Sequence, residues 1–363
     1  MDNEPSQRKK MIVDFEPSYL EAIPDPIILL DNDRKIIFSN DAASNIFNVQ
    51  IHSDLVNTIR DPVLLRSVDE VLAKRISAEA ILTLFDPVKL TYQIRVIPVS
   101  LATNSADMRV LLLFNDISSE IVVEKIRQDF VENVSHELRS PISSLIGFIE
   151  TIQGPAKDDA ESQKKFLSIM MSEAQRMSRM VEDLLSLSKV EVIERMRPEE
   201  PADLTNLITM TTELFARQAQ NRSMNIKLDM DVNLPSIQGD ADELLQVFNN
   251  LVDNAIKYGR EKTNILIKVR VIDRIPDIGG TGGTGDTGIS IVVENEGDGI
   301  NPDEIPRLTE RFYRTDKGRS RELGGTGLGL AIVKHIINRH RGRLVINSNL
   351  NDKTTFTVFL PLK

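Results

Sequence analysis

Hydrophobic and polar positions follow three different patterns along this chain, and the first covers about residues 16–117. There, Pro26–Leu30 and Lys35–Ser39 are short apolar runs on either side of the polar turn Asp31–Arg34, which predicts an antiparallel hairpin. Asn40 follows and opens a predicted helix. Further strand-like runs occur at Ala80–Phe85, Leu90–Val99 and Met108–Asn115. Together these elements predict a mixed α/β unit.

Between residues 118 and 194 the apolar positions take a helical period, in two stretches separated by Gly154-Pro155. The apolar stripe of the first stretch consists of Phe130, Val134, Leu138, Ile142, Leu145 and Ile149. The stripe of the second consists of Phe166, Met170, Ala174, Met177, Val181 and Leu184. Two long helices with one apolar face each cannot bury those faces alone. We therefore expect two such hairpins to pair as a four-helix bundle, which makes the protein a homodimer.

From about residue 195 to residue 363, helical and strand patterns alternate, which predicts a third, α/β domain. Asp240–Glu243 is typical of a capping box. We expect Asp240 to accept from first-turn N–H groups while Glu243 reaches back, which stabilises the helix by about 1 kcal/mol. The glycine-rich run Gly279–Gly288 leads into an apolar strand and not into a helix, so we interpret it as a hairpin connection.

Composition and charge narrow the classes of protein. With 44 basic against 54 acidic residues the net charge is -10, which argues against nucleic acid as the main partner. The chain has no cysteine, which excludes disulfides, thiolate metal sites and cysteine nucleophiles. No run approaches the roughly 20 apolar residues that cross a bilayer, and residues 1–15 form a polar segment unlike a signal peptide. We expect a cytoplasmic protein, associated with a membrane only if an anchor precedes this chain.

His136 is the first candidate for chemistry. Helical geometry places it about 200° around the axis from Val134, so it faces solvent, where an imidazole is an available nucleophile. Glu137 can orient the proton on the other ring nitrogen, and Ser140 lies one turn beyond on the same face. A lone histidine of this kind is ordinarily a surface residue. The whole string Phe130–Pro141, however, resembles the phosphoacceptor box of histidine kinases, which implies that His136 is phosphorylated. Serine stands at Ser140 where that family usually has threonine, whose hydroxyl helps to position water for phosphatase action.

A second cluster lies in Asn249–Tyr258. Asn250, Asn254, Lys257 and Tyr258 share one face of the predicted helix, and an amide oxygen can ligate Mg²⁺. The segment resembles the N box of the same kinases. The resemblance implies that Asn254 is the Mg²⁺ ligand and that the other three bind ATP, with Asn250 and Lys257 near the phosphates.

Glycines mark two further segments. Gly324–Leu330 precedes a helical pattern and follows Arg311–Arg321, where five basic residues meet one acidic residue, as suits a mobile lid over a triphosphate. This region resembles the ATP lid and second glycine box of the family. It implies ATP contacts from Arg321, Gly325, Thr326, Gly327, Leu328 and Gly329.

The first glycine box of the family resembles Val293–Ile300, which implies that Asn295, Gly297 and Gly299 lie at the adenine. The family usually has aspartate where this chain has Asn295. An amide oxygen can also accept from the adenine amino group, but it carries no charge. The final box, at Asn351–Phe356, has none of the usual glycines. We expect His52, His335 and His340 to be structural or surface residues.

Taken together, these segments resemble sensor histidine kinases of two-component systems, most closely the phosphate-regulon sensor kinases. The resemblance implies an α+β PAS sensory domain at residues 16–117. A signalling helix with a dimerisation and histidine phosphotransfer hairpin follows at 118–194, and a GHKL-type ATP-binding α/β sandwich at 195–363. It also implies ATP and Mg²⁺ as cofactors and the receiver domain of a response regulator as partner. Two alternatives stay open, which are a non-catalytic ATP-gated scaffold and a different GHKL ATPase.

Overall fold

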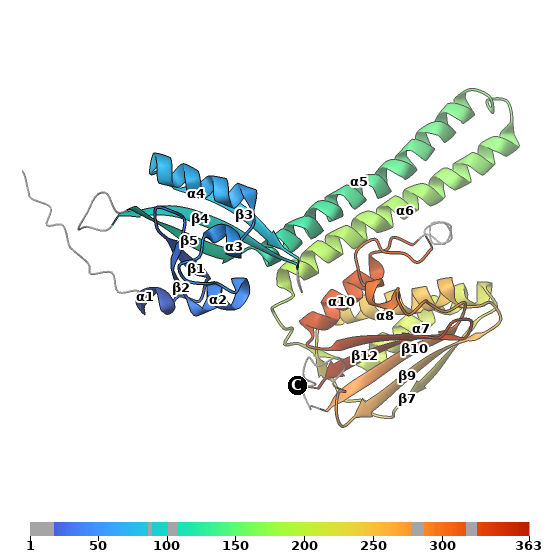
Figure 1. Cartoon of the computed structure of the whole chain (residues 1–363). Coiled ribbons are helices and arrows are strands. Elements are labelled where there is room, and N and C mark those ends of the chain that lie inside the picture. Colours follow the sequence, from blue (N-terminus) through green and yellow to red (C-terminus); the bar gives the residue numbers. More distant parts are fainter. Residues whose placement is uncertain (1–17, 86–88, 101–107, 277–286, 317–324, 363) are drawn as a thin grey trace, which may run out of the picture. The chain divides into compact units, whose positions relative to one another are not determined.

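The structure is a computed structural model that describes residues 18–85, 89–100, 108–276, 287–316 and 325–362 (Figure 1). Arg321 and most of the glycine-rich run Gly279–Gly288 lie outside the described residues. The chain forms two compact units that divide between Val131 and Glu132. None of the helices that the structure describes has the length and apolar character to cross a membrane.

The first unit is built on a five-stranded antiparallel sheet of order β2-β1-β5-β4-β3. Its strands are β1 (Ile27–Leu30), β2 (Ile36–Ser39), β3 (Ala78–Leu84), β4 (Leu90–Ser100) and β5 (Met108–Asp116). Its helices are α1 (Ser18–Glu21), α2 (Asp41–Phe47), α3 (Leu55–Thr58) and α4 (Pro62–Lys74). The predicted hairpin is confirmed, because β1 pairs with β2 through Leu29 and Phe38. Asn40 caps α2 and also accepts from the Ile27 amide at 2.9 Å, so one side chain joins the helix to the sheet.

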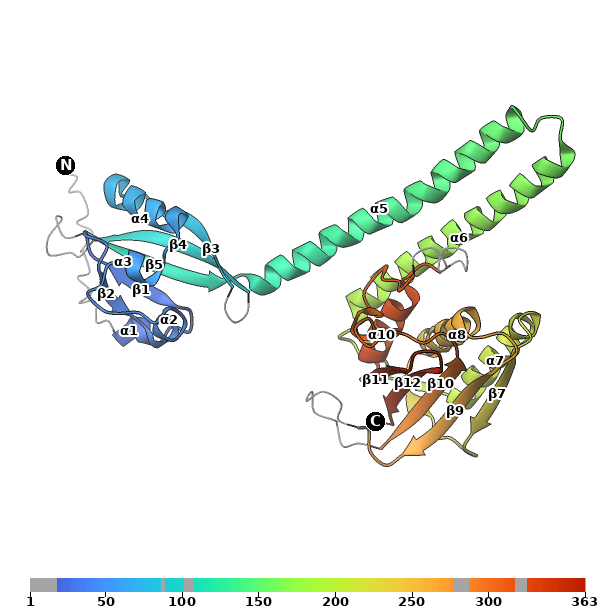
Figure 2. The same ribbon diagram turned by 45° about the vertical axis from the view of Figure 1, so that its right-hand side comes forward.

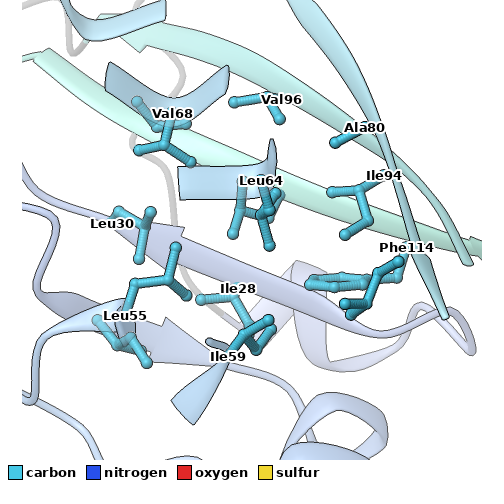
Figure 3. Packing of buried hydrophobic residues seen from close by; sticks show 14 of the residues in the cluster. Ile28, Leu30, Leu55, Ile59, Leu64, Val68, Ala80, Ile94, Val96 and Phe114 are labelled. Atoms are coloured by element: carbon cyan, nitrogen blue, oxygen red, sulfur yellow. The ribbon is translucent and has the colours of Figure 1, made fainter. Parts of the chain in front are cut away.

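The core of this unit lies between α4 and one face of the sheet (Figure 3). Alternate residues of the strands point inward, as the period of two requires, and Leu64 and Val68 of α4 pack on them. At one end, the Phe47 and Phe114 rings lie 4.8 Å apart, and Tyr92 meets Phe114 edge-on at 6.1 Å. This filled core, and the sheet order around it, give the α+β domain that the sequence predicts.

The helical region consists of α5 (Ser118–Gln153) and α6 (Ala160–Ile193), and α5 runs across the division between the two units. Asp159 caps α6, and the Phe148 and Phe166 rings stack between the helices at 5.5 Å. The predicted stripe of α5 is only partly covered within this chain, since Ile142 is 44% exposed.

Helix α6 has a second buried face that the sequence analysis missed. Met180, Leu187 and Val190 are almost fully buried, although none of them belongs to the predicted stripe. They are covered because α10 (Gly329–Arg339) packs against α6. Helix α6 therefore packs against α5 with one face and against α10 with another.

The rest of the second unit is a two-layer α/β sandwich. Its sheet has the order β11-β12-β10-β9-β7, with β7 and β9 parallel and the other pairs antiparallel. The helices α7, α8 and α10 lie on one face of this sheet (Figure 2). The remaining bounds are α7 (Leu204–Asn221), α8 (Ala241–Tyr258), β7 (Asn225–Met230), β9 (Asn264–Ile272), β10 (Gly288–Glu296), β11 (Arg343–Ser348) and β12 (Lys353–Pro361). Two short strands, β6 (Pro201–Ala202) and β8 (Ile237–Gln238), pair with each other, and η1 (Ile305–Arg307) is a single turn. Since β9 and β10 are antiparallel neighbours, the glycine-rich run connects a hairpin, as predicted.

Of the two contacts predicted for the capping box at the start of α8, one is present. Asp240 caps the helix by accepting from the amides of Asp242 and Glu243, both at 3.1 Å. The expected return contact of Glu243 is wrong, because the Glu243 carboxylate pairs with Arg339 of α10 at 2.5 Å. The Asp240 amide donates to His340 Nε2 at 3.0 Å. A long-range ion pair therefore replaces the expected local hydrogen bond.

His340 links α10 to α8 in its neutral form, and this predicts a pH dependence of stability. Its Nδ1 donates to the Ile336 carbonyl at 2.8 Å, which leaves Nε2 to accept from Asp240. Burial lowers the pKa of His340, more than Glu243 and Asp240 raise it. The unfolded chain, with an ordinary histidine pKa of about 6.5, then binds more protons than the folded one. We expect thermal stability to fall as the pH drops below about 6.5 toward the folded pKa.

Thermal unfolding of the full chain across that range, followed by circular dichroism, measures the effect. His340→Gln should be less stable than the parent at neutral pH but should lose less stability on acidification. His52→Asn, a change at an exposed histidine of the first unit with positive φ, should keep the parent's profile. An unaltered acid slope in His340→Gln would contradict this account.

Candidate functional site

A cavity of about 880 Å³ lies between α8, the end of β10, the segment before α10 and one side of α6. Its size suits a ligand as large as a nucleotide. Eleven of the residues that the motifs assigned to ATP line it: Asn250, Asn254, Lys257, Tyr258, Asn295, Gly297, Gly299, Gly325, Thr326, Gly327 and Gly329. Leu328, also assigned to ATP, is instead completely buried beneath the segment. The structure thus brings three separate motifs to one place.

Helix α8 presents its polar face to this cavity because its apolar face is buried in the sandwich. Asn250 Nδ2 is buried and has no hydrogen-bond partner among the described residues, which is the state of a donor that meets a ligand. Lys257 Nζ lies 2.5 Å from the Asp253 carboxylate, so its charge is held at the cavity wall. At Gly329, a Cβ would stand 3.0 Å from Asn250 Oδ1, so any larger residue here would crowd the Asn250 amide.

The end of β10 forms another wall. Asn295 is 4% exposed and lines the cavity opposite Thr354 of β12. Gly299 has a φ of 73°, and a Cβ there would collide with the Asn349 carbonyl oxygen. The glycine is therefore required for the chain to turn under the cavity.

The glycine segment, Gly325–Gly329, is held by a backbone contact with Phe312. The Phe312 amide donates to the Gly327 carbonyl at 2.8 Å, and a Cβ on Gly327 would lie 2.9 Å from Phe312 Cα. The Leu328 amide donates to Thr326 Oγ1 at 3.3 Å. The segment ends at the N-terminus of α10, where free N–H groups and the helix dipole favour an anion.

These residues fit a nucleotide with Mg²⁺. The orphaned amide of Asn250, the Lys257 charge and the helix N-terminus are donors for phosphate oxygens. Among the residues that the structure describes, no cluster of three or more His, Cys, Asp or Glu side chains could hold a metal ion by itself. A cation here would depend on the Asn254 amide oxygen and on ligand oxygens, as Mg²⁺ does when it binds with phosphates.

The candidate phosphoacceptor lies on α5, outside the cavity wall. The His136 side chain is 62% exposed, and its Nε2 lies 3.7 Å from Glu132 Oε1. Glu137 Oε2 accepts from Arg176 Nη2 at 3.0 Å and from Arg314 Nη2 at 3.3 Å. Ser140 is exposed one turn further along. Because Arg314 lines the cavity, Glu137 connects the turn that carries His136 to the cavity wall.

Helix α6 supplies a part of the cavity wall that was not predicted from the sequence. Asp183 lines the cavity and accepts from Thr326 Oγ1 at 2.7 Å, and burial raises the pKa of its carboxyl. Arg179 and Glu182 line the cavity beside it. The available signal was the spacing of Met180, Asp183 and Leu187, which marks the second face of the helix.

Three parts of the chain match models of known protein families. Residues 18–80 match the PAS domain and residues 126–192 the His Kinase A (phospho-acceptor) domain. Residues 239–363 match the histidine kinase-, DNA gyrase B- and HSP90-like ATPases. The chain is 32% identical over 356 residues to the phosphate regulon sensor protein PhoR of Pseudomonas aeruginosa, covering 96% of this chain and 75% of PhoR. This chain belongs to the sensor histidine kinases.

Two further histidine kinases are similar to this chain over different shares of their length. The sensor protein kinase WalK of Staphylococcus saprophyticus is 33% identical over 251 residues, which are 69% of this chain and 39% of WalK. The histidine kinase ThkA, solved in complex with the response regulator protein TrrA, has the same fold. It aligns with a TM-score of 0.50 and 22% identity over 96% of this chain and 99% of its own.

Asn295 gives a direct test of the adenine wall. If its amide oxygen accepts from the adenine amino group, Asn295→Asp replaces a neutral acceptor with a charged one of the same shape. The gain should be at most about 1–2 kcal/mol, or roughly five- to thirty-fold in the ATP Kd. Asn295→Ala should weaken binding by about 1–3 kcal/mol. Calorimetric titration with a non-hydrolysable ATP analogue measures both.

Asn264→Asp, at the exposed start of β9, adds the same charge to the same domain and should leave the Kd unchanged. If Asn295→Ala binds as tightly as the parent, Asn295 does not contact adenine.

Proposed function

We propose that this kinase binds ATP with Mg²⁺ in the cavity, transfers the γ-phosphoryl group to His136, and passes it to an aspartate of a response-regulator receiver domain. One observation carries the proposal: eleven residues assigned to ATP line one cavity, and Glu137, the neighbour of His136, is bound by Arg314 of its wall. The name of PhoR supports the phosphate regulon as the setting.

The wall residues divide the nucleotide among themselves. Asn295 and Thr354 lie at the adenine end, and Asn250, Lys257 and the segment Gly325–Gly329 lie where phosphates can be bound. Asn254 supplies an oxygen for the metal. Bound ATP and Mg²⁺ supply an activated phosphoryl group whose charge is partly neutralised.

At His136, the unprotonated imidazole nitrogen attacks the γ-phosphorus in line. The nitrogen–phosphorus bond forms as the bond to the β-phosphate oxygen breaks, and ADP leaves. The imidazole proton passes to a neighbouring carboxylate, for which Glu132, with Oε1 3.7 Å from His136 Nε2, is placed. Because His136 lies outside the cavity wall, transfer requires the ATP-binding part to move relative to the hairpin.

The partly bare apolar face of the hairpin supports a homodimer. Ile142, Ile146 and Ile149 of α5 are 44%, 52% and 42% exposed, and Leu167 and Met171 of α6 are 56% and 61% exposed. A second copy of the hairpin can cover these side chains as a four-helix bundle, which leaves His136 accessible on the outside. Ser140, with its hydroxyl one turn from His136, is placed to assist hydrolysis of the phosphorylated regulator.

The experiment is incubation with ATP labelled on the γ-phosphate and Mg²⁺. His136→Gln should abolish acid-labile, base-stable labelling completely, because the acceptor nitrogen is gone. It should bind ATP as the parent does, since the cavity is built elsewhere. His52→Asn, an exposed histidine of the first unit, is the matched control and should label normally.

Three other outcomes are informative. Persistent label on His136→Gln would disprove the acceptor assignment. Release of free phosphate by the parent, with the protein unlabelled, would indicate an ATPase. ATP binding with neither product would indicate a non-catalytic scaffold.

A further inference from the structure

Three polar contacts join the segments around the cavity to acidic residues of the helical hairpin. Thr326 Oγ1 donates to Asp183 at 2.7 Å, Arg311 Nη2 lies 2.6 Å from Glu191, and Arg314 Nη2 lies 3.3 Å from Glu137. We call these the docking contacts. The donors are Arg311, Arg314 and Thr326, and each acceptor is a carboxylate on α5 or α6.

The Asp183 contact lies inside the nucleotide cavity itself. Asp183 and Thr326 both line the cavity, and burial raises the pKa of the Asp183 carboxyl more than the Thr326 hydrogen bond and the Lys257 charge lower it. Thr326 in turn accepts from the Leu328 amide, so its hydroxyl organises the turn before α10. The hydroxyl of Thr326, a donor of the glycine segment, is therefore already bound to the Asp183 carboxylate of the hairpin.

The docking contact of Arg314 with Glu137 also uses a residue that lines the cavity. Arg314 lines the cavity and its side chain is 5% exposed, so its guanidinium is held by Glu137 in a place sheltered from water. Carboxylates and phosphates accept from the same donors with similar geometry. A triphosphate placed near Thr326 and Arg314 would meet donors already bound to carboxylates, and it would meet their negative charge.

The backbone couples the contacts to one another. Phe312 lies between Arg311 and Arg314, and its amide is bonded to the Gly327 carbonyl, one residue after Thr326. Phe312 also has a φ of 62°, an unfavourable conformation for a bulky side chain that packing must maintain. This backbone hydrogen bond ties Arg311–Arg314 to the glycine segment, so we expect a shift at Thr326 to move Arg311 and Arg314 as well.

We propose that Asp183 stands in for a nucleotide phosphate, so that ATP binding and the docking of the glycine segment on the hairpin exclude each other. The proposal rests on the proposed function, since it takes the cavity as the ATP site. ATP then displaces Asp183 from Thr326 and releases the ATP-binding part, which is the movement that transfer to His136 requires. By linkage, docking weakens ATP binding by the same factor by which ATP weakens docking, so a variant that docks less should bind ATP more tightly.

The test uses the full chain with Asp183→Asn, which keeps the shape of the side chain and removes its charge. We expect the Kd of a non-hydrolysable ATP analogue with Mg²⁺ to fall about five- to thirty-fold, within the usual range of coupling between sites. Asp158→Asn, the same change in the exposed turn before α6, should leave the Kd unchanged. Equal affinities of Asp183→Asn and parent would overturn the proposal.

Docking is measured separately through the contact of Ser186 with Gln246, whose Oγ and Oε1 atoms lie 2.9 Å apart between α6 and α8. The chain has no cysteine, so the double variant Ser186→Cys and Gln246→Cys can be bridged selectively by a short bismaleimide. Bridging should slow when the analogue is added, and Asp183→Asn should slow it without nucleotide. A rate that neither change affects would contradict the proposal.

The docking proposal and the proposed kinase function can be disproved separately. If analogue and Asp183→Asn both leave bridging and affinity unchanged while His136 is labelled normally, the docking proposal is wrong and the kinase function stands. If parent and variant both fail to bind the analogue, the cavity is not an ATP site, and both proposals are wrong.

Discussion

The burial of helix α10 is the interaction on which the second unit depends. Ala331, Ile332, Val333, Ile336 and Ile337 are all at most 1% exposed, because the helix packs on α6, α8 and β11 at once. Burying one such aliphatic side chain is worth about 1.5–3 kcal/mol, so this helix stabilises the unit strongly. Its N-terminus carries the glycine segment, and the position of that segment follows from the packing of the helix behind it.

The contacts on the two sides of α10 differ in kind. Toward α8 it adds the buried pair of Arg339 with Glu243 and the neutral link of His340 to Asp240. Toward α6 it adds His335, whose Nδ1 lies 2.8 Å from Glu194, and the docking contacts continue this polar rim. The pairs of His335 with Glu194 and of Arg311 with Glu191 are partly exposed, and such pairs contribute little stability each. Such a rim suits a contact that forms and breaks during the catalytic cycle.

Local patterns predicted most of what depends on neighbouring residues. The strands of the first unit, the Asn40 cap and the polar face of α8 follow from periods of two and 3.6, and the structure confirms these elements. The walls of the cavity were predictable because glycine and asparagine motifs have fixed spacing. The predictions that were wrong concern residues whose partners lie far away in the chain. Glu243 was assigned to its own helix terminus, but Arg339, almost one hundred residues later, binds it.

The second face of α6 was missed for a related reason. A single stripe was counted on this helix, although a helix with two partners carries two, so Asp183 on the second face was not among the candidate site residues. Likewise, the position next to His136 suggested that Glu137 orients the imidazole, while the structure gives it Arg176 and Arg314 as partners. Those arginines lie on another helix and in another segment, so spacing along the sequence carries no sign of them.

The central claim is that the cavity and α5 form one phosphotransfer system whose acceptor is His136. Peptide mapping by mass spectrometry tests it most directly, on protein incubated with ATP and Mg²⁺ and kept at neutral to alkaline pH so that phosphohistidine survives. We expect phosphate on the peptide that contains His136, at a level that falls when a receiver domain is added. Phosphate confined to any other residue would contradict it.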